Sequence, residues 1–210
     1  PLVLNDTGKH VISFQQCNDK LNIFNGSQLL ASMNILSKKQ FAAAPTLNIE
    51  HELVEKQRVN LHKFYEWVKL KGIEYKAQYQ TCTDAFVDNA ASLGLVKFNF
   101  SVCNFSRSVA QLDAIFQSVF VVLYSSCNRS VDKLPIPVMV HNIKSFEKLQ
   151  SGTYWTKVTV LGNSSTLCIA NCEVYDAITN DLVLALDKVK FAKPQEQTSD
   201  LISFDQTWLK

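Results

Sequence analysis

Asp113 and Gln117 are the residues of this sequence whose types and spacing most clearly suggest chemistry. They are polar interruptions of a largely apolar stretch, Ser108 to Tyr124. If the stretch is a helix, a spacing of four places both side chains on one face, where the amide can donate to the carboxyl group. A carboxyl group among apolar neighbours has a raised pKa and can act as an acid. The simpler alternative is an aspartate near the positive end of a helix dipole, which needs no function.

The stretch that carries this pair has the composition of a buried helix. Large apolar side chains cover most of the remaining circumference, namely Leu112, Ile115, Phe116, Val119, Phe120, Val122 and Leu123. A helix that is apolar nearly all round is enclosed by other elements. We therefore expect a central helix from about Arg107 to Tyr124, packed against a sheet.

Strand patterns fill most of the remaining chain. Alternating apolar residues predict strands over 75–87 and 92–100, and after the helix over 135–146, 153–161, 166–175 and 182–191. Residues 1–36 suggest three or four short strands in a meander, with Asn25-Gly26 as the best hairpin signal. A long apolar helix followed by an antiparallel meander is the hotdog arrangement, so the predicted class is α+β with the sheet wrapped around the helix.

One shorter helix is predicted ahead of these strands. Leu61 to Leu70 is amphipathic, Asn60 can cap its start, and Gly72 lies just past its end. Residues 48–57 are charged and suggest either a surface helix or an extended linker.

Composition bounds the function classes. The 210 residues can bury a core, and a net charge of +2 gives no reason to expect nucleic acid. No apolar run reaches the roughly 18 residues of a membrane span. The six cysteines match no zinc pattern, so we expect reduced thiols, no metal site and a cytoplasmic chain. The sequence starts without Met, and we expect it to be a piece of a longer chain.

Three ordered motifs carry a resemblance to a known family. Phe64 to Tyr79 is similar to an entry motif that ends in Gly-x-x-Tyr-Gly-Pro-x-Phe. Ser108 to Gln117 is similar to His-Pro-x-x-Leu-Asp-x-x-x-Gln, and Leu134-Pro135 resembles a Leu-Pro strand start. In this order and spacing the motifs resemble the dehydratase domains of polyketide synthases, which are related to those of animal-type fatty acid synthases. The resemblance covers roughly residues 58–208.

The resemblance implies a double hotdog whose first half is incomplete here. It divides the chain into remnant strands and a connector (1–46), a linker (47–60), the C-terminal hotdog (61–192) and a linker that follows the domain (193–210). Residues 1–36 are then expected to pair with strands that lie outside this sequence.

The resemblance also implies an activity. These domains remove water from a β-hydroxyacyl chain carried on the phosphopantetheine of an acyl carrier protein, with no bound cofactor. Asp113 and Gln117 would be catalytic, with Gln117 holding the aspartate. Tyr75, Tyr79, Leu112 and Phe116 would contact the substrate. The implied partners are the carrier protein and the other synthase domains, and a homodimer is left open.

Departures from the family pattern keep other functions open. In the family, a histidine in a motif of the first hotdog acts as the catalytic base. None of the four histidines of this sequence lies in such a motif, namely His10, His51, His62 and His141. We therefore expect the catalytic histidine to precede this sequence and the isolated chain to be inactive. Residues 75–79 lack the Gly-Pro, and Ser108-Val109 replaces His-Pro. The alternatives are a product-template or cyclase-like domain, a non-catalytic structural remnant and, with less support, a stand-alone hotdog thioesterase.

Overall fold

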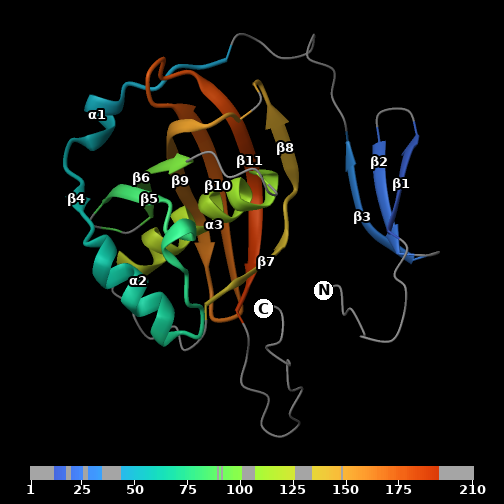
Figure 1. Ribbon diagram of the computed structural model, residues 1–210, viewed down its shortest axis with the longest axis horizontal. Coiled ribbons are helices and arrows are strands. Elements are labelled where there is room, and N and C mark those ends of the chain that lie inside the picture. The colour runs from blue at the N-terminus through green and yellow to red at the C-terminus, as the bar shows by residue number, and fades with distance from the viewer. Residues whose placement is uncertain are drawn as a thin grey trace, which may run out of the picture.

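The computed structural model describes most of the chain between residues 12 and 193 (Figure 1). The described ranges are 12–17, 20–25, 28–34, 44–88, 90, 92–100, 107–125, 134–147 and 149–193. Only the backbone is described within 12–34, apart from Gln15, and at residues 78 and 107–110.

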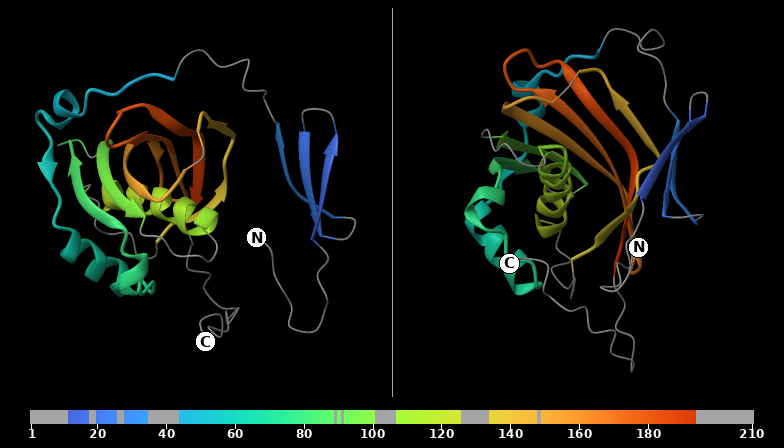
Figure 2. Two further views of the ribbon diagram at one scale, coloured as in Figure 1. Left: turned by 45° about the horizontal axis from the view of Figure 1, so that its top comes forward. Right: turned by 45° about the vertical axis from the view of Figure 1, so that its right-hand side comes forward.

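An eight-stranded antiparallel sheet forms the larger part of the fold. Its strands are β4 (Gln57–Arg58), β5 (Cys82–Val87), β6 (Leu93–Phe100), β7 (Ile136–Met139), β8 (Asn142–Ser145), β9 (Gly152–Asn163), β10 (Leu167–Asp176) and β11 (Leu182–Ala192). The strand order is β4-β5-β6-β9-β10-β11-β7, and β8 also pairs with β11. The sheet curves around one helix, as Figure 2 shows.

That helix is α3 (Arg107–Ser125), and it occupies the interior as predicted. It packs against β5, β6, β9 and β10. Ile115, Val119 and Val121 are fully buried, while Leu112 near its start is 37% exposed. Alternate residues of β10 supply the facing surface, including Cys168 and Cys172. The helix is therefore held mainly by apolar burial, which requires its sequence to be apolar on nearly every side.

Gly94 of β6 sets how closely α3 approaches the sheet. A Cβ atom built on Gly94 would lie 2.3 Å from Cγ2 of Val122, well inside van der Waals contact. The missing side chain thus makes room for Val122, as is typical of a glycine in a strand that another element approaches closely.

The amphipathic helix α2 (Leu61–Leu70) also forms as predicted. Asn60 caps it, because its Oδ1 accepts a hydrogen bond from the Lys63 backbone N–H at 3.0 Å. Gly72 follows the helix with φ of +94°, a conformation that glycine adopts without strain. Phe64 and Val68 are fully buried, and they pack α2 against the core.

The chain after α2 differs from the prediction. Residues 75–87 were predicted as one strand, but β5 begins only at Cys82, and Ala77–Tyr79 form a 3-10 helix. Side-chain hydrogen bonds hold this turn, since Gln80 Nε2 donates to the Tyr75 carbonyl at 2.8 Å. The turn aims the segment at α3 instead of extending the strand, which an alternation pattern does not reveal.

The predicted strand over 135–146 is two strands instead of one. β7 pairs with residues 190–192 of β11, and β8 pairs with residues 184–187. Between these registers Lys188 has a φ of +50°, which bends β11. The edge strand follows the bend in two pieces, joined where the His141 N–H donates to the Asp187 carbonyl at 3.2 Å.

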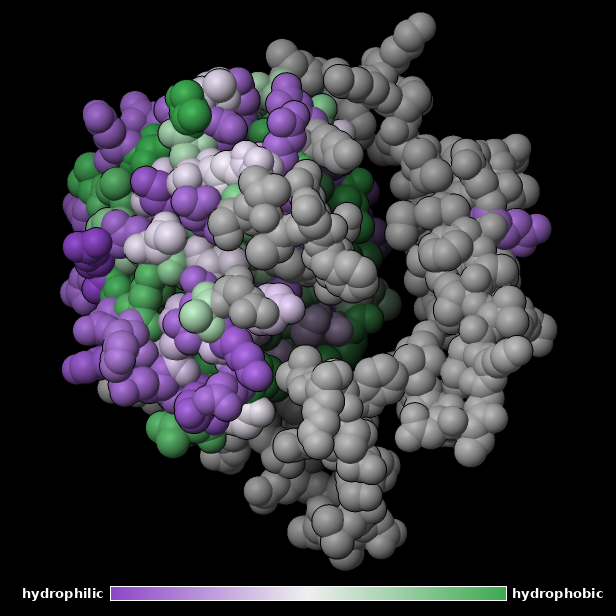
Figure 3. Space-filling model, viewed as in Figure 1, coloured by the Kyte–Doolittle hydropathy of each residue, from purple (hydrophilic) through white to green (hydrophobic). Residues whose placement is uncertain are grey.

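This edge of the sheet is apolar and exposed. Four residues of β7 and β8 expose between 42% and 56% of their surface, namely Ile136, Val138, Met139 and Ile143. Figure 3 shows green along this side of the larger part of the molecule. An exposed apolar edge strand is a surface with which another strand can pair.

The segment expected to be a linker, 47–60, packs on the outer face of the sheet. It contains helix α1 (Ile49–Leu53) and the short strand β4, which pairs with β5. Leu47 joins Leu95, Trp155 and Tyr175 in a second apolar cluster. Glu52 adds an ion pair with Lys157 at 2.5 Å. Much of this segment is therefore attached to the sheet, even though it connects two groups of strands along the chain.

The first strands form a sheet of their own. β1 (Ile12–Cys17), β2 (Lys20–Asn25) and β3 (Gln28–Asn34) are antiparallel in the order β1-β2-β3, as the predicted meander requires. Asn25 pairs with Gln28 across the predicted Asn25-Gly26 turn. The run Leu2–Leu4, expected to be a further strand, lies outside the described residues. The described part of 1–36 contains no helix that these strands could wrap.

Three of the six cysteines have described side chains. Cys82, Cys168 and Cys172 are free and buried, while the side chains of the other three cysteines lie outside the described residues. Among the helices that the structure describes, none combines the length and apolar character needed to cross a membrane.

Candidate active site

Asp113 and Gln117 meet on one face of α3, as their spacing predicts. Gln117 Nε2 donates to Asp113 Oδ2 at 2.6 Å. Gln117 is only 1% exposed, and Asp113 is partly buried. The carboxyl group is therefore held in position by a neighbour that is itself fixed in the core.

Hydrogen bonds from three other elements use the remaining capacity of the Gln117 amide. Nε2 also donates to the Tyr79 carbonyl at 3.0 Å. On the other side, Oε1 accepts from Tyr65 Oη at 3.0 Å and from Cys82 Sγ at 4.0 Å. Acceptors lie on the nitrogen side and donors on the oxygen side, so the amide has one orientation that satisfies every contact.

Tyr75 contacts the other oxygen of Asp113. Its Oη donates to Asp113 Oδ1 at 3.3 Å. The segment between α2 and β5 brings this about, because it carries both the Tyr75 side chain and the Tyr79 carbonyl to the same face of α3. Both oxygens of the carboxyl group thus have a partner, and the two partners come from different elements.

Burial sets the protonation of this cluster. It raises the pKa of Asp113 above its ordinary value, against the opposing effect of hydrogen bonds from Gln117 and Tyr75. Burial likewise raises the pKa of Tyr65 and of Tyr75, and it raises the pKa of the Cys82 thiol to about 12. Near neutral pH the two hydroxyls and the thiol keep their protons, so Asp113 is the member of this group that titrates first.

The four residues expected to contact substrate fall into two groups. Tyr75 and Tyr79 join the cluster, Tyr79 through its carbonyl group, and the Tyr79 residue is 44% exposed. Leu112, the residue before Asp113 in the sequence, is 37% exposed. Phe116 instead packs edge-on against Phe191, with ring centroids 5.7 Å apart. No contact of Leu112 or Phe116 with the polar cluster is described, and their role stays a prediction.

Tyr65 and Cys82 were not predicted to belong to this cluster. Tyr65 lies on the buried stripe of α2, four residues after Leu61 and three before Val68. A buried tyrosine hydroxyl needs a hydrogen-bond partner, and that requirement was the available signal. Cys82 begins β5, and neither its type nor its spacing pointed to Gln117.

The described histidines lie elsewhere. His51, His62 and His141 are all exposed, and none has a described hydrogen bond to Asp113. His62 lies 3.5 Å from the Glu66 carboxylate one turn along α2. His10 lies outside the described residues. The expectation that none of these three histidines serves this site agrees with their placement.

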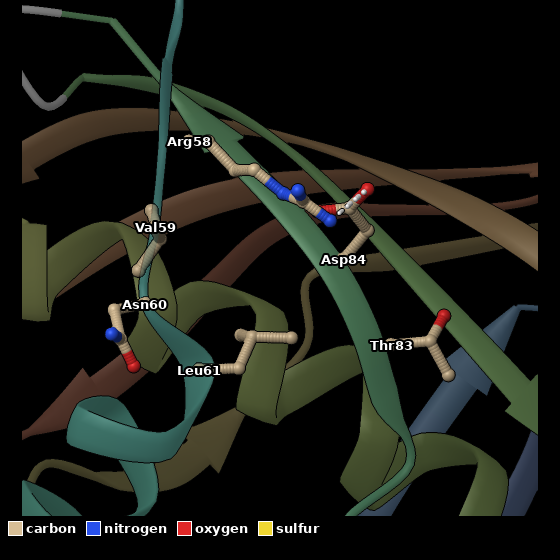
Figure 4. Close-up of a pocket in the computed structure, with 6 residues that line it drawn as sticks. All are labelled: Arg58, Val59, Asn60, Leu61, Thr83 and Asp84. Carbon is tan, nitrogen blue, oxygen red and sulfur yellow. Dashed lines mark hydrogen bonds and ion pairs between the residues drawn. The ribbon is translucent and has the colours of Figure 1, made fainter.

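A surface depression lies at a different place. Its volume is about 380 Å³, and it is open to solvent between β4, the start of α2 and β5. Figure 4 shows the residues that line it: Arg58, Val59, Asn60, Leu61, Thr83 and Asp84. Arg58 Nε lies 2.9 Å from Asp84 Oδ1, so the two charges neutralise each other. Asp113 does not line this depression.

Within the residues that the structure describes, no three His, Cys, Asp or Glu side chains are grouped so that they could hold a metal ion. A carboxyl group such as that of Asp113 can give or take a proton.

Comparison with known proteins identifies the fold. No protein-family model matches the sequence, and no curated protein matches it. Solved structures do match. The dehydratase domain of RzxB from Pseudomonas fluorescens superposes with a TM-score of 0.65 at 14% identity, over 86% of this chain and 66% of that domain.

Two further structures show the same likeness. The dehydratase domain of a mycocerosic acid synthase-like polyketide synthase gives a TM-score of 0.70 at 14% identity, over 90% of this chain and 69% of that one. The dehydratase domain of the CurF module of curacin polyketide synthase gives 0.64 at 20% identity, over 86% and 66%. The chain spans about two thirds of the length of these domains. At such identities the likeness concerns the fold: this chain has the hotdog fold of polyketide synthase dehydratase domains.

Proposed function

We propose that this chain is the dehydratase part of a type I polyketide or fatty acid synthase. In this proposal it removes water from a β-hydroxyacyl thioester carried on the phosphopantetheine of an acyl carrier protein, and it leaves an α,β-unsaturated acyl chain. The observation that carries the proposal is the Asp113 carboxyl group, fixed by Gln117 at 2.6 Å on the central helix of a dehydratase-type hotdog.

The chemistry needs one acid and one base. The base removes the proton next to the thioester carbonyl, the electron pair forms the carbon–carbon double bond, and the β-hydroxyl leaves as water with a proton from the acid. Asp113 suits the acid role because burial raises its pKa and so keeps the carboxyl group protonated to higher pH. After the product leaves, Asp113 regains a proton from solvent and the base releases its proton to solvent, which restores the site.

Similar structures support the importance of an aspartate and a histidine. A CurK dehydratase with an aspartate-to-asparagine substitution is described as an inactive mutant. A CurJ dehydratase with a histidine-to-phenylalanine substitution, in complex with a compound, is described in the same way. We propose that Asp113 takes the part of the acid here and that the base is a histidine outside the described residues.

A non-catalytic role in a synthase is the second candidate. It is favoured by the exposure of His51, His62 and His141, which leaves Asp113 without a histidine among its described neighbours. A product-template role would use the same fold to guide the cyclisation or shape of the product. Both alternatives predict no loss of water from a β-hydroxyacyl substrate.

Mass spectrometry of a pantetheine-linked β-hydroxyacyl substrate tests the proposal. The full-length protein that contains this chain is expected to remove the mass of one water from the substrate. The 210-residue chain by itself is expected to do so slowly or not at all. Absence of water loss with the full-length protein, over a series of acyl lengths and both alcohol configurations, would overturn the proposal in favour of the non-catalytic role.

A further inference from the structure

The hydroxyl group of Tyr65 connects three elements behind the candidate acid. It belongs to α2, it accepts a hydrogen bond from the Cys82 backbone N–H of β5 at 3.2 Å, and it donates to Gln117 Oε1 of α3 at 3.0 Å. Tyr65 does not touch Asp113 in any described hydrogen bond. Among the described hydrogen bonds, the one route from Tyr65 Oη to the carboxyl group runs through the amide of Gln117.

The direction of each hydrogen bond in this chain is fixed by chemistry. A backbone N–H can only donate, so Tyr65 Oη accepts from Cys82 and has its single hydrogen left for Gln117. The atom of Gln117 that receives this hydrogen must be the oxygen. The two amide hydrogens then point to Asp113 Oδ2 and to the Tyr79 carbonyl.

The orientation of the Gln117 amide also affects the Asp113 carboxyl group. Oδ2 of Asp113 accepts an N–H at 2.6 Å, and a carbonyl-type oxygen is the better acceptor in that contact. In the acid form the proton therefore belongs on Oδ1, which faces Tyr75 Oη at 3.3 Å. Tyr75 can donate to Oδ1 when Asp113 is ionised and accept from it when Asp113 is protonated, because a hydroxyl does both.

We propose that Tyr65 is a positioning residue: it holds the Gln117 amide in the orientation that donates to Asp113, and it thereby assigns the acid proton to Oδ1. The positioning role in dehydration rests on the proposed function. The coupling between Tyr65, Gln117 and Asp113 does not, and it can be measured without substrate.

A purely structural role for Tyr65 is the alternative. Its ring packs against Phe64 and Tyr75, with centroids 4.9 and 6.1 Å away. Tyr65→Phe keeps the ring and removes only the hydroxyl. Tyr154→Phe is a matched control, because the Tyr154 hydroxyl is also buried and also accepts a backbone N–H, from Gln150 at 3.0 Å, but lacks any described bond to the cluster.

A double-mutant cycle separates the two roles. Titration of the Asp113 carboxyl carbon by NMR in the 210-residue chain gives its pKa in Tyr65→Phe, Gln117→Leu, the double variant and Tyr154→Phe. Gln117→Met replaces Gln117→Leu if the latter fails to fold. We expect an upward shift of the Asp113 pKa in Tyr65→Phe, a larger one in Gln117→Leu, and no additional shift in the double variant. Tyr154→Phe should leave the titration unchanged.

Additive shifts, or no shift in Tyr65→Phe, would overturn the coupling. A second experiment uses the full-length protein. There Tyr65→Phe should lower kcat more than it changes KM. It should also move the alkaline limb of the kcat profile to higher pH, because the acid stays protonated to higher pH. Coupled titration with an unchanged kcat in an active enzyme would overturn the positioning role. Failure of the wild-type protein to release water would overturn the proposed function alone, since the NMR cycle still decides the coupling.

Discussion

Gln117 Nε2 lies 2.6 Å from Asp113 Oδ2, one helical turn away on the same face of α3. The amide is almost completely buried and has a partner for each of its hydrogens. The carboxyl group is thus placed by the core of the domain itself and not by a surface loop. Functional side chains generally need a position and orientation that are fixed in this way.

The stability of the protein should depend on the titration of Asp113. Burial raises the pKa of this group above 3.8, so the folded state binds its proton more tightly than the unfolded state does. The resulting stabilisation is fully present below the unfolded pKa and is lost as pH rises through the folded pKa.

Asp113→Asn removes this titration while keeping the shape of the side chain. The unfolding free energy of the wild type relative to the variant should therefore fall as the pH is raised through the folded pKa. Urea unfolding of both proteins over a pH series measures this difference. A difference that is flat or that grows in favour of the wild type would mean that Asp113 is not buried as described.

Gln117→Ala should slow the proposed reaction less than Asp113→Asn does. The variant leaves the acid in place but removes a hydrogen bond to a carboxyl group that becomes charged as it gives up its proton, which corresponds to a loss on the order of tenfold in rate. Ser118→Ala is the control, because Ser118 is buried on the same helix and its hydroxyl bonds only to the Ala114 carbonyl in the described contacts. Equal losses in the two variants would point to general damage to α3.

Gly94→Ala should destabilise the domain by crowding Val122. The new Cβ would meet Cγ2 of Val122 at 2.3 Å, and overpacking of this kind costs about 1–3 kcal/mol. Thermal unfolding of Gly94→Ala, Val122→Ala and the double variant checks the contact. The double variant should be more stable than the sum of the single changes predicts; strict additivity would show that the two residues do not meet.

Phe120→Ala and Phe116→Ala form a graded pair on α3. Both rings pack edge-on against Phe191, with centroids 5.8 and 5.7 Å away, but Phe120 is buried and Phe116 is partly exposed. Phe120→Ala should cost about 3–5 kcal/mol of unfolding free energy, and Phe116→Ala should cost less. Chemical denaturation gives both values, and the reverse order would contradict the burial described for α3.

The sequence was sufficient for those features that depend on local spacing. The all-round apolar stretch predicted α3, and the interval between Asp113 and Gln117 predicted their hydrogen bond. The cap at Asn60 and the glycine at position 72 predicted the limits of α2. Each of these is decided by residues within one or two helical turns.

Features that depend on distant residues were beyond such patterns. Tyr65 and Gln117 are 52 positions apart, so no periodicity relates them. The turn at 77–79 is held in part by Gln117, 38 positions from Tyr79, and it replaced part of a predicted strand. The division of 135–146 into β7 and β8 follows a bend in β11, near Lys188.

The most direct test of the proposed acid is Asp113→Asn in the full-length protein, assayed by mass spectrometry on a β-hydroxyacyl pantetheine thioester. Asparagine keeps the shape of the side chain and can still hydrogen-bond to Gln117 and Tyr75, but it has no acidic proton to give. Removal of a general acid costs about a hundredfold to ten-thousandfold in rate. We predict a loss of that size in the rate of water release, with the fold unchanged. Water release at the wild-type rate from a folded Asp113→Asn protein would contradict the account, because Asp113 would then have no part in the chemistry.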